Sequence, residues 1–162
     1  MHSFSVGKLR IVLIFMYLCI AVQMMKKNVE DLLKAHNVSP TAMRMIVLDH
    51  LLDQQAALSL ADLEKALAPA DRITIYRSLR TFESKGLVHG IDDGSGVTKY
   101  ACCAADCGPE GHHDVHVHFV CRNCQETYCL PRSRIPEFTL PVGFQPEEVN
   151  LVVRGVCQVC AG

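Results

Sequence analysis

Residues 71–87, "DRITIYRSLRTFESKGL", carry the clearest helical pattern of the chain, and the rest of the fold can be placed around them. Apolar side chains recur at helical spacing along one face and are Ile75, Leu79 and Phe82. Side chains that lie off this stripe include Tyr76, Arg77 and Arg80. Because Gly86 lies where a C-terminal cap belongs, the helix should end there.

Two shorter helices are expected before this stretch. Ser39 supplies an N-cap and Pro40 a first-turn proline for a helix over about residues 40–53. Residues 59–62, "SLAD", form a capping box that begins a short helix, and Pro69 limits its length. The segment before residue 71 therefore predicts helix, turn and helix.

The periodicity changes from helical to strand-like after Gly86. The runs "LVHGI" and "VTKYACC" flank "DDGSG", which is a strong hairpin turn signal. Three helices followed by a two-stranded hairpin is the order of a winged helix, although an unrelated α+β domain could share it. Residues 104–113 are rich in Gly, Pro and polar side chains, which indicates a linker.

The segment after the linker predicts a small, mainly β domain. Strand patterns occur at "VHVHFVC", "ETYCL" and "EEVNLVVRGVC", and prolines exclude a long helix between the last two. Such a domain has little core of its own and would gain stability from a metal ion or a partner chain.

Composition limits the function classes. The chain of 162 residues has 49% hydrophobic and 20% charged residues, which is typical of a globular protein. Its net charge of −1 gives no global field for nucleic acid, so a DNA-binding surface must be local. Such a surface is available between residues 72 and 85, where four basic residues accompany one acid, Glu83.

The N-terminal residues resemble a targeting signal in part. Lys8 and Arg10 precede an apolar run over residues 11–22, but the run is short for a membrane span and no small-x-small cleavage site follows. We expect translation to begin at Met24 or Met25 and residues 1–23 to be a mis-assigned extension. The protein is then expected to be cytoplasmic, without a membrane partner.

Two Cys-x-x-Cys pairs give the strongest chemical signal in the sequence. Eight of the nine cysteines lie after residue 100, and four of them form these two pairs. This pattern favours a metal site over disulfides. Four thiolates in two tight turns select a tetrahedral structural zinc, and redox dithiols or an iron–sulfur cluster are the alternatives. The four candidate ligands are Cys121, Cys124, Cys157 and Cys160.

A second candidate metal site centres on "HVH". In a strand His116 and His118 point to the same face, so both imidazoles can reach one ion, and solvated strand histidines are the alternative. His112 and His113 are better interpreted as surface imidazoles of the linker. Other potential ligands nearby in sequence are Cys102, Cys107, Asp114 and Cys129.

The order of these motifs resembles the ferric uptake regulator family of metal-dependent transcription regulators. The segments that carry the resemblance are "SPTAMRMIVLDHL", "DRITIYRSLRTFESKGLV", "TKYACC", "HVHFVCRNC" and the terminal Cys-x-x-Cys, and they span nearly the whole chain from about residue 26. The resemblance implies an α+β protein with an N-terminal winged helix-turn-helix domain (24–103), a hinge (104–113) and a small α/β dimerisation domain (114–162) with a four-cysteine zinc site.

The resemblance also implies site residues. Its sensory metal ligands correspond to His89, Cys103, His116 and His118, which is most like the zinc uptake regulator branch. Its recognition helix corresponds to residues 71–85, with Tyr76 and Arg77 at the positions that approach DNA. The candidate DNA contacts on this helix are Arg72, Thr74, Tyr76, Arg77 and Arg80, and a solvated helix face is the alternative. Cys129 departs from the family pattern, because many relatives have a carboxylate there, and it could be a further ligand or a buried apolar residue. Cys102 leaves the identity of the sensory thiolate ambiguous by one residue.

The expected function is therefore a zinc-dependent repressor of metal uptake genes, a homodimer that binds operator DNA. A regulatory zinc would join the two domains and fix their angle in the DNA-competent dimer. Iron- or peroxide-responsive regulation and a zinc-ribbon module without DNA binding are the alternatives. The sequence lacks the His-x-Glu with Pro-Cys-x-x-Cys and the His-Glu-x-x-His motifs of zinc enzymes, so we expect neither catalysis nor a small-molecule substrate.

Overall fold

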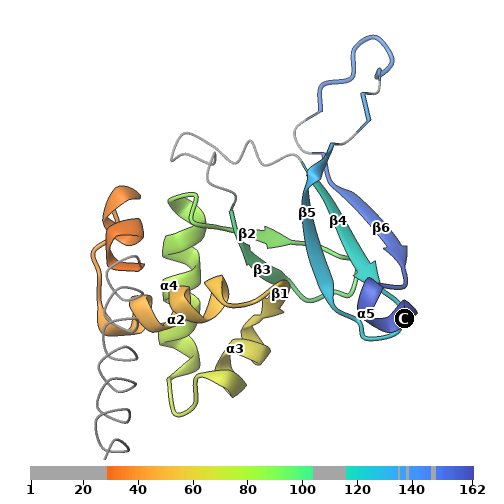
Figure 1. The fold of residues 1–162 in the computed structure, drawn as a ribbon. Helices are drawn as coiled ribbons and strands as arrows, with labels where there is room; N and C mark the ends of the chain where they lie inside the picture. The colour runs from red at the N-terminus through yellow and green to blue at the C-terminus, as the bar shows by residue number, and fades with distance from the viewer. Residues whose placement is uncertain (1–28, 104–115, 135, 138, 147–148) are drawn as a thin grey trace, which may run out of the picture.

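The computed structural model describes residues 29–103, 116–134, 136–137, 139–146 and 149–162 (Figure 1). The predicted extension at 1–23 and the hinge at 104–113 lie outside the described residues, as do His112, His113 and Asp114. After a helical segment at 29–35, the helices are α2 (Ala42–Leu52), α3 (Leu60–Ala66), α4 (Arg72–Ser84) and α5 (Gln158–Ala161). The strands are β1 (Ala56–Ser59), β2 (Val88–Ile91), β3 (Lys99–Cys102), β4 (His116–Cys121), β5 (Thr127–Arg134) and β6 (Leu151–Gly155).

Helix α4 has the boundaries and the buried face that its sequence predicts. The Asp71 side chain accepts a hydrogen bond from the Thr74 N–H and caps the N-terminus. Gly86 has φ +69°, and the Leu87 N–H donates to the Phe82 carbonyl at 2.9 Å, which closes a Schellman-type C-cap. The stripe of Ile75, Leu79 and Phe82 is fully buried among residues of α2 and α3.

The other helices of this half begin at side-chain caps. Ser59 and Asp62 form the predicted capping box of α3, with both reciprocal hydrogen bonds present. The predicted N-cap of α2 was wrong: Thr41 is the cap, and its hydroxyl accepts from the Arg44 N–H at 3.4 Å. Ser39 lies two residues before this cap, and its carbonyl accepts a hydrogen bond from the Arg44 guanidinium at 2.9 Å.

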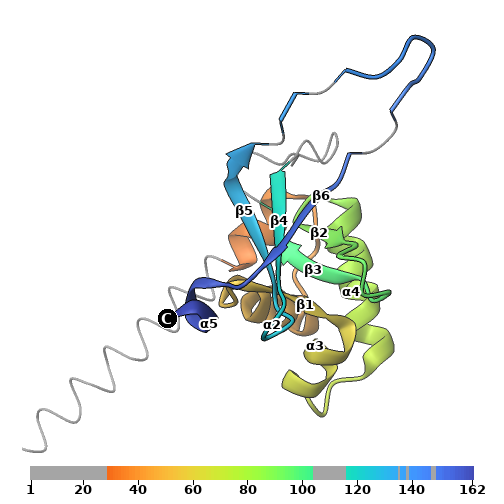
Figure 2. The same ribbon diagram turned by 90° about the vertical axis from the view of Figure 1, so that its right-hand side faces the viewer.

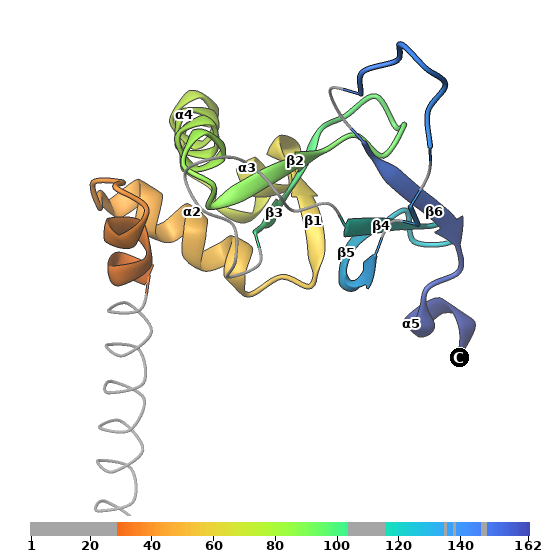
Figure 3. The same ribbon diagram turned by 90° about the horizontal axis from the view of Figure 1, so that it is seen from above.

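One six-stranded sheet, in the order β2-β3-β1-β5-β4-β6, runs through both halves of the molecule. Figures 1 and 3 show α2, α3 and α4 at one end of this sheet and β4, β5 and β6 with α5 at the other. Strand β1 joins them, because it pairs with β3 (Leu58 opposite Tyr100) and with β5 (Ala56 opposite Tyr128). We call residues 29–103 the helical lobe and the described part of residues 116–162 the strand lobe.

The strand lobe is built around β4, which pairs antiparallel with β5 and parallel with β6. The β4–β5 register shifts between His116 and Val117, and β5 bulges there around Pro131, which has no N–H for a ladder hydrogen bond. Between β5 and β6 the described residues form no helix, as the prolines predicted, and this segment projects away from the sheet (Figures 1 and 2).

Most of the buried apolar residues belong to the helical lobe, where thirteen of them form one core cluster. The strand lobe has a short list of buried residues that includes Val117, Val120 and Thr127 with two cysteines, Cys121 and Cys157. Such a lobe needs cross-links beyond apolar packing. Within the part of the chain that the structure describes, no helix is long and apolar enough to cross a membrane.

Candidate metal centre

The two Cys-x-x-Cys pairs meet at one end of the strand lobe. The first pair lies in the turn between β4 and β5, where the Gln125 N–H donates to the Cys121 carbonyl at 3.0 Å. Cys157 is the N-cap of α5, and Cys160 lies within that helix. Parallel pairing of β6 with β4, which sets Gly155 opposite Cys121, brings the second pair to the first. The four residues Cys121, Cys124, Cys157 and Cys160 are called the cysteine cluster below.

The geometry of the cysteine cluster fits a tetrahedral metal ion. All four sulfurs lie within 4.8 Å of one another, and the Cys124 and Cys157 sulfurs are 3.9 Å apart. Zinc–sulfur bonds of about 2.3 Å place tetrahedral sulfurs about 3.8 Å apart. N–H groups of Cys124 and Cys157 lower the pKa of Cys121 to about 6, whereas the hydrogen bond with Cys157 raises the pKa of Cys160. Four thiolates here therefore need a cation.

A second group of potential ligands lies between the two lobes. His89 comes from β2 of the helical lobe, whereas His116 and His118 come from alternate positions of β4. Cys129 lies directly opposite His118 in the β4–β5 register, so both side chains share a face of the sheet. These four residues, His89, His116, His118 and Cys129, are called the histidine cluster below.

Distances within the histidine cluster also match tetrahedral coordination. The four potential ligand atoms lie within 4.8 Å of one another. His89 Nε2 is 3.3 Å from His118 Nε2 and 3.4 Å from Cys129 Sγ. A zinc ion with ordinary bond lengths separates two nitrogens by about 3.3 Å and a nitrogen and a sulfur by about 3.5 Å. The three imidazoles are buried, at 5–8% exposed, so an ion here would be shielded from water.

Cys103, the thiolate that the family resemblance implies, lies on the other side of His89. Its sulfur is 3.6 Å from His89 Nδ1, whereas Cys129 approaches Nε2. The structure therefore brings three of the four expected sensory residues into the cluster and adds Cys129 as the sulfur. Neighbouring Cys102 packs against the core of the helical lobe, where burial raises its thiol pKa to about 12.

Cys129 carried a partial signal in the sequence, because it departs from the pattern of the family that the motifs resemble. Only the strand register shows which way its sulfur points. Asn150 and Asp93, which contribute to the contacts between the lobes, carried no signal in the sequence.

The candidate DNA-binding residues share the solvent-exposed face of α4. Arg72, Thr74, Tyr76, Arg77 and Arg80 are all exposed. Arg72 pairs with Glu64 and Arg80 with Glu83, each at 2.5 Å. Such exposed ion pairs contribute little stability, so these guanidinium groups can exchange a carboxylate for a phosphate at small cost. Ile73, which is 58% exposed, adds an apolar side chain to the same face.

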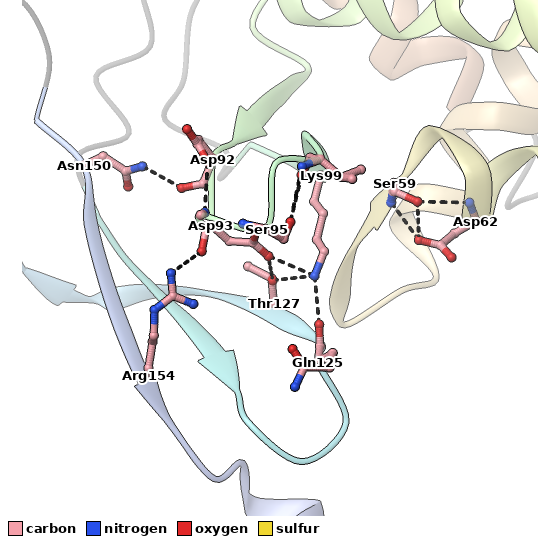
Figure 4. A network of polar contacts seen from close by, with 12 residues as sticks. Ser59, Asp62, Asp92, Asp93, Ser95, Lys99, Gln125, Thr127, Asn150 and Arg154 are labelled. Atoms are coloured by element: carbon pink, nitrogen blue, oxygen red, sulfur yellow. Dashed lines mark hydrogen bonds and ion pairs between the residues drawn. The ribbon is translucent and has the colours of Figure 1, made fainter.

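A buried polar network holds the turn over residues 92–98, called the wing turn below, against the strand lobe (Figure 4). Asp93, which is 1% exposed, accepts a hydrogen bond from the Thr127 hydroxyl at 2.6 Å and pairs with Lys99 at 2.9 Å. Burial alone would raise the pKa of Asp93, but hydrogen bonds from Ser95, Thr127 and Lys99 outweigh it and hold that pKa far below its usual range.

Replacing Asp93 with asparagine should lower the free energy of unfolding by about 3 kcal/mol at neutral pH, because Lys99 then lacks its buried partner. A depressed native pKa stabilises the fold above the unfolded-state pKa of about 4 and loses this effect as pH falls further. The difference between wild type and Asp93→Asn should therefore shrink below about pH 4. Urea unfolding at several pH values measures it. The exposed neighbour Asp92 is the control, and an equal loss in Asp92→Asn would contradict the prediction.

Comparison with known proteins identifies the family. The sequence model described as the ferric uptake regulator family matches residues 35–141, which is more than half of the chain. The chain belongs to the ferric uptake regulator family. The resemblance inferred from the motifs is thereby confirmed, and with it a metal-responsive, DNA-binding transcription regulator rather than an enzyme.

Individual members of the ferric uptake regulator family share about a quarter or less of their residues with this chain. The peroxide operon regulator of Bacillus subtilis (strain 168) is 26% identical over 151 residues, covering 83% of this chain and 92% of the relative. A zinc uptake regulator solved with zinc and DNA has a TM-score of 0.59 at 21% identity, covering 86% of this chain and 94% of its own. The ferric uptake regulator of Vibrio cholerae has a TM-score of 0.53 at 23% identity, covering 79% of this chain and 98% of its own. These structures share the fold, an N-terminal DNA-binding domain followed by a dimerisation domain.

Proposed function

We propose that this member of the family is a zinc-dependent repressor of metal uptake genes that acts on operator DNA in the cytoplasm. The observation that carries the proposal is the histidine cluster, in which three imidazoles and one thiolate from both lobes face one another at zinc-like distances. The cysteine cluster would hold a second, structural zinc ion. The domain boundaries proposed are 24–103, 104–113 and 114–162.

The donor set supports zinc over iron. Imidazole and thiolate are ligands that zinc prefers, whereas carboxylates suit harder ions. Cys129 supplies the sulfur of the histidine cluster, and no carboxylate joins that cluster among the described residues. A second thiol, Cys103, lies 3.6 Å from His89 and keeps the surroundings soft. The Cys103 sulfur lies beside His89 Nδ1, whereas the Cys129 sulfur lies beside the Nε2 atom that faces His118.

The ligands come from both lobes, and this supports a mechanism in which metal occupancy sets the angle between them. Zinc, when bound, would link His89 of β2 to His116 and His118 of β4. Strand β2 directly follows α4, so the position of His89 is tied to the orientation of that helix. In a two-fold dimer this orientation sets the spacing of the two α4 helices, which must match DNA half-sites about a helical turn apart.

The surface of the strand lobe supports a homodimer. Strand β6 is an edge of the sheet, and exposed apolar side chains lie on it and on the segments either side of it. They are Leu140, Val142, Phe144, Val153, Val156 and Val159. An exposed sheet edge and exposed apolar side chains in the segments next to it favour association with another chain.

The proposal is tested by DNA binding under controlled metal conditions. The probe is a duplex selected from randomised DNA by the zinc-loaded protein, and binding is followed by electrophoretic mobility shift. We expect binding with zinc, loss when a chelator removes the ion of the histidine cluster, and recovery on adding zinc but not iron or manganese. Recovery by iron alone would contradict a zinc sensor, and metal-independent binding would contradict a metal switch.

A peroxide-responsive regulator is the second candidate, because one relative is named a peroxide operon regulator. The distinguishing outcome is DNA binding that requires iron and is lost when dilute hydrogen peroxide oxidises the iron-loaded protein. The thiolate of the histidine cluster argues against it, since iron-based peroxide sensing uses nitrogen and oxygen ligands. A zinc-ribbon module without DNA binding would give no shift with any metal.

Replacing Arg77 with alanine should weaken binding to the selected duplex by about 10- to 100-fold, the value of one good contact to a base edge. Arg77 lies on the exposed face of α4 and belongs to neither cluster, so the zinc content of Arg77→Ala should stay at the wild-type value. Metal analysis and mobility shifts on the same preparation measure both. As a control, Arg44→Ala removes a partly buried arginine of α2, outside the candidate DNA-binding face. Wild-type affinity in Arg77→Ala would refute its role in recognition.

A further inference from the structure

Asn150 touches both a candidate metal ligand and the wing turn. It precedes β6, and its side-chain oxygen lies 3.4 Å from His118 Nδ1. Its side-chain nitrogen donates a hydrogen bond to the Asp92 carbonyl at 3.1 Å, as Figure 4 shows. One amide group of the strand lobe thus contacts a residue of the histidine cluster and the backbone of the helical lobe.

Both contacts select the same orientation of the Asn150 amide. His118 Nε2 faces the interior of the histidine cluster, 3.3 Å from His89 Nε2. An ion bound at Nε2 leaves Nδ1 as the N–H donor, and this N–H needs an acceptor such as the Asn150 oxygen. With that oxygen committed to His118, the amide nitrogen necessarily faces Asp92, whose carbonyl can only accept. If the Asn150 amide were flipped, its oxygen would face the Asp92 carbonyl oxygen and its NH₂ group would face the His118 N–H, so neither hydrogen bond could form.

A second side chain of the strand lobe, Arg154, also contacts the wing turn. Arg154 of β6 donates to the Asp93 carbonyl at 2.5 Å, and the same guanidinium lies where a side chain at position 94 would be. A Cβ at Gly94, whose φ is +77°, would be 2.6 Å from Arg154 Nη2, so the turn backbone rests directly against this side chain. A small shift of β6 should therefore move the backbone of the wing turn as well.

We propose that Asn150 is a positioning residue that couples metal occupancy at His118 to the wing turn. The inference rests on the proposed function, because it assumes an ion in the histidine cluster. Metal binding at Nε2 fixes the His118 tautomer, the His118 N–H orients the Asn150 amide, and the amide nitrogen holds the Asp92 carbonyl. Of the contacts between wing turn and strand lobe in the described residues, this one includes a candidate ligand.

The coupling from His118 through Asn150 to the Asp92 carbonyl is called the relay below. Two substitutions separate its contact to His118 from its contact to Asp92. Asn150→Asp keeps an oxygen to accept from His118 but removes the donor to the Asp92 carbonyl. Asn150→Ala removes both groups. Gln145→Asp is the matched control, because Gln145 is exposed on the same segment and the substitution makes the same change of charge. All variants are studied as the full chain, with the cysteine cluster checked for retained zinc.

The measurements are zinc affinity, by competition with a chromophoric chelator, and hydrogen–deuterium exchange of residues 92–98 with and without zinc. In wild type and Gln145→Asp we expect zinc to slow exchange of the wing turn. Asn150→Asp should bind zinc at least as tightly as wild type. The factor by which zinc slows exchange of the wing turn should nevertheless be about fivefold smaller than in wild type, which is the value of one hydrogen bond. Asn150→Ala should lose the slowing and also bind zinc about tenfold more weakly, as expected for an outer-shell partner.

Two outcomes overturn the relay while leaving the proposed function intact. One is wild-type slowing of the wing turn in Asn150→Asp, and the other is wild-type zinc affinity in Asn150→Ala, each alongside normal zinc-dependent DNA binding of the wild type. If the wild type itself binds no zinc at the histidine cluster, the proposed function fails and the relay fails with it. The wild-type arm therefore distinguishes the two failures.

Discussion

Replacing Cys129 with alanine should empty the histidine cluster and abolish zinc-dependent DNA binding. The Cys129 sulfur is 3.4 Å from His89 Nε2 and shares a face with His118, so its loss removes the thiolate of the set. We expect zinc affinity to fall by more than about 100-fold, because even outer-shell changes cost 10- to 100-fold. Metal content should fall from one ion for each of the two clusters to the ion of the cysteine cluster alone. Metal analysis with mobility shifts measures both effects.

Cys103→Ala is the matched control for this prediction, since it removes the other thiol next to His89. It should keep the ion and most of the DNA affinity, because Cys103 faces Nδ1 rather than the Nε2 that points into the histidine cluster. The reverse pattern, a silent Cys129→Ala and an inactive Cys103→Ala, would return the sensory thiolate to the position implied by the family resemblance. Cobalt substitution adds a direct readout, as sulfur-to-cobalt charge-transfer absorption should disappear from the site in Cys129→Ala alone.

Replacing Cys121 with serine should unfold the strand lobe. Cys121 is fully buried, its sulfur accepts a hydrogen bond from the Cys157 N–H at 3.3 Å, and it belongs to the cysteine cluster that joins β4 to the segment after β6. Structural zinc contributes on the order of 10 kcal/mol to the folding of small domains, and the strand lobe has few buried apolar residues to replace it. We expect loss of the dimer and of β-sheet signal, measured by sedimentation and circular dichroism.

The control for this second prediction is Cys102→Ala, a change of a cysteine outside both clusters. Its thiol packs against the helical lobe, so the expected cost is that of a small change in packing, about 1 kcal/mol. A folded, dimeric Cys121→Ser protein with a full complement of zinc would show that the cysteine cluster is not what holds the strand lobe together.

Local sequence signals determined most of the helical lobe. The buried stripe of α4, its cap at Gly86 and the capping box at Ser59 depend on residues within one or two turns of each other, so spacing alone is enough to find them. The cysteine cluster could also be predicted from spacing, because each Cys-x-x-Cys pair supplies two ligands from one short turn and a tetrahedral zinc ion binds four ligands. The N-cap of α2 was assigned wrongly because Ser39 and Thr41 are both good caps, and local sequence does not show which hydroxyl accepts from the first-turn N–H of Arg44.

The sequence by itself thus determined the family, the helix pattern of the DNA-binding half and the two groups of metal-binding residue types. Only the tertiary structure decided which sulfur faces His89 Nε2, because β5 register and the side of the imidazole on which each thiol lies are set by pairing between distant strands. The same holds for β1, a short strand that joins the two lobes into one sheet, and for Asn150 and Asp93. Their partners lie tens of residues away, and contacts at that separation depend on the packing of the whole chain and leave no periodic pattern in the sequence.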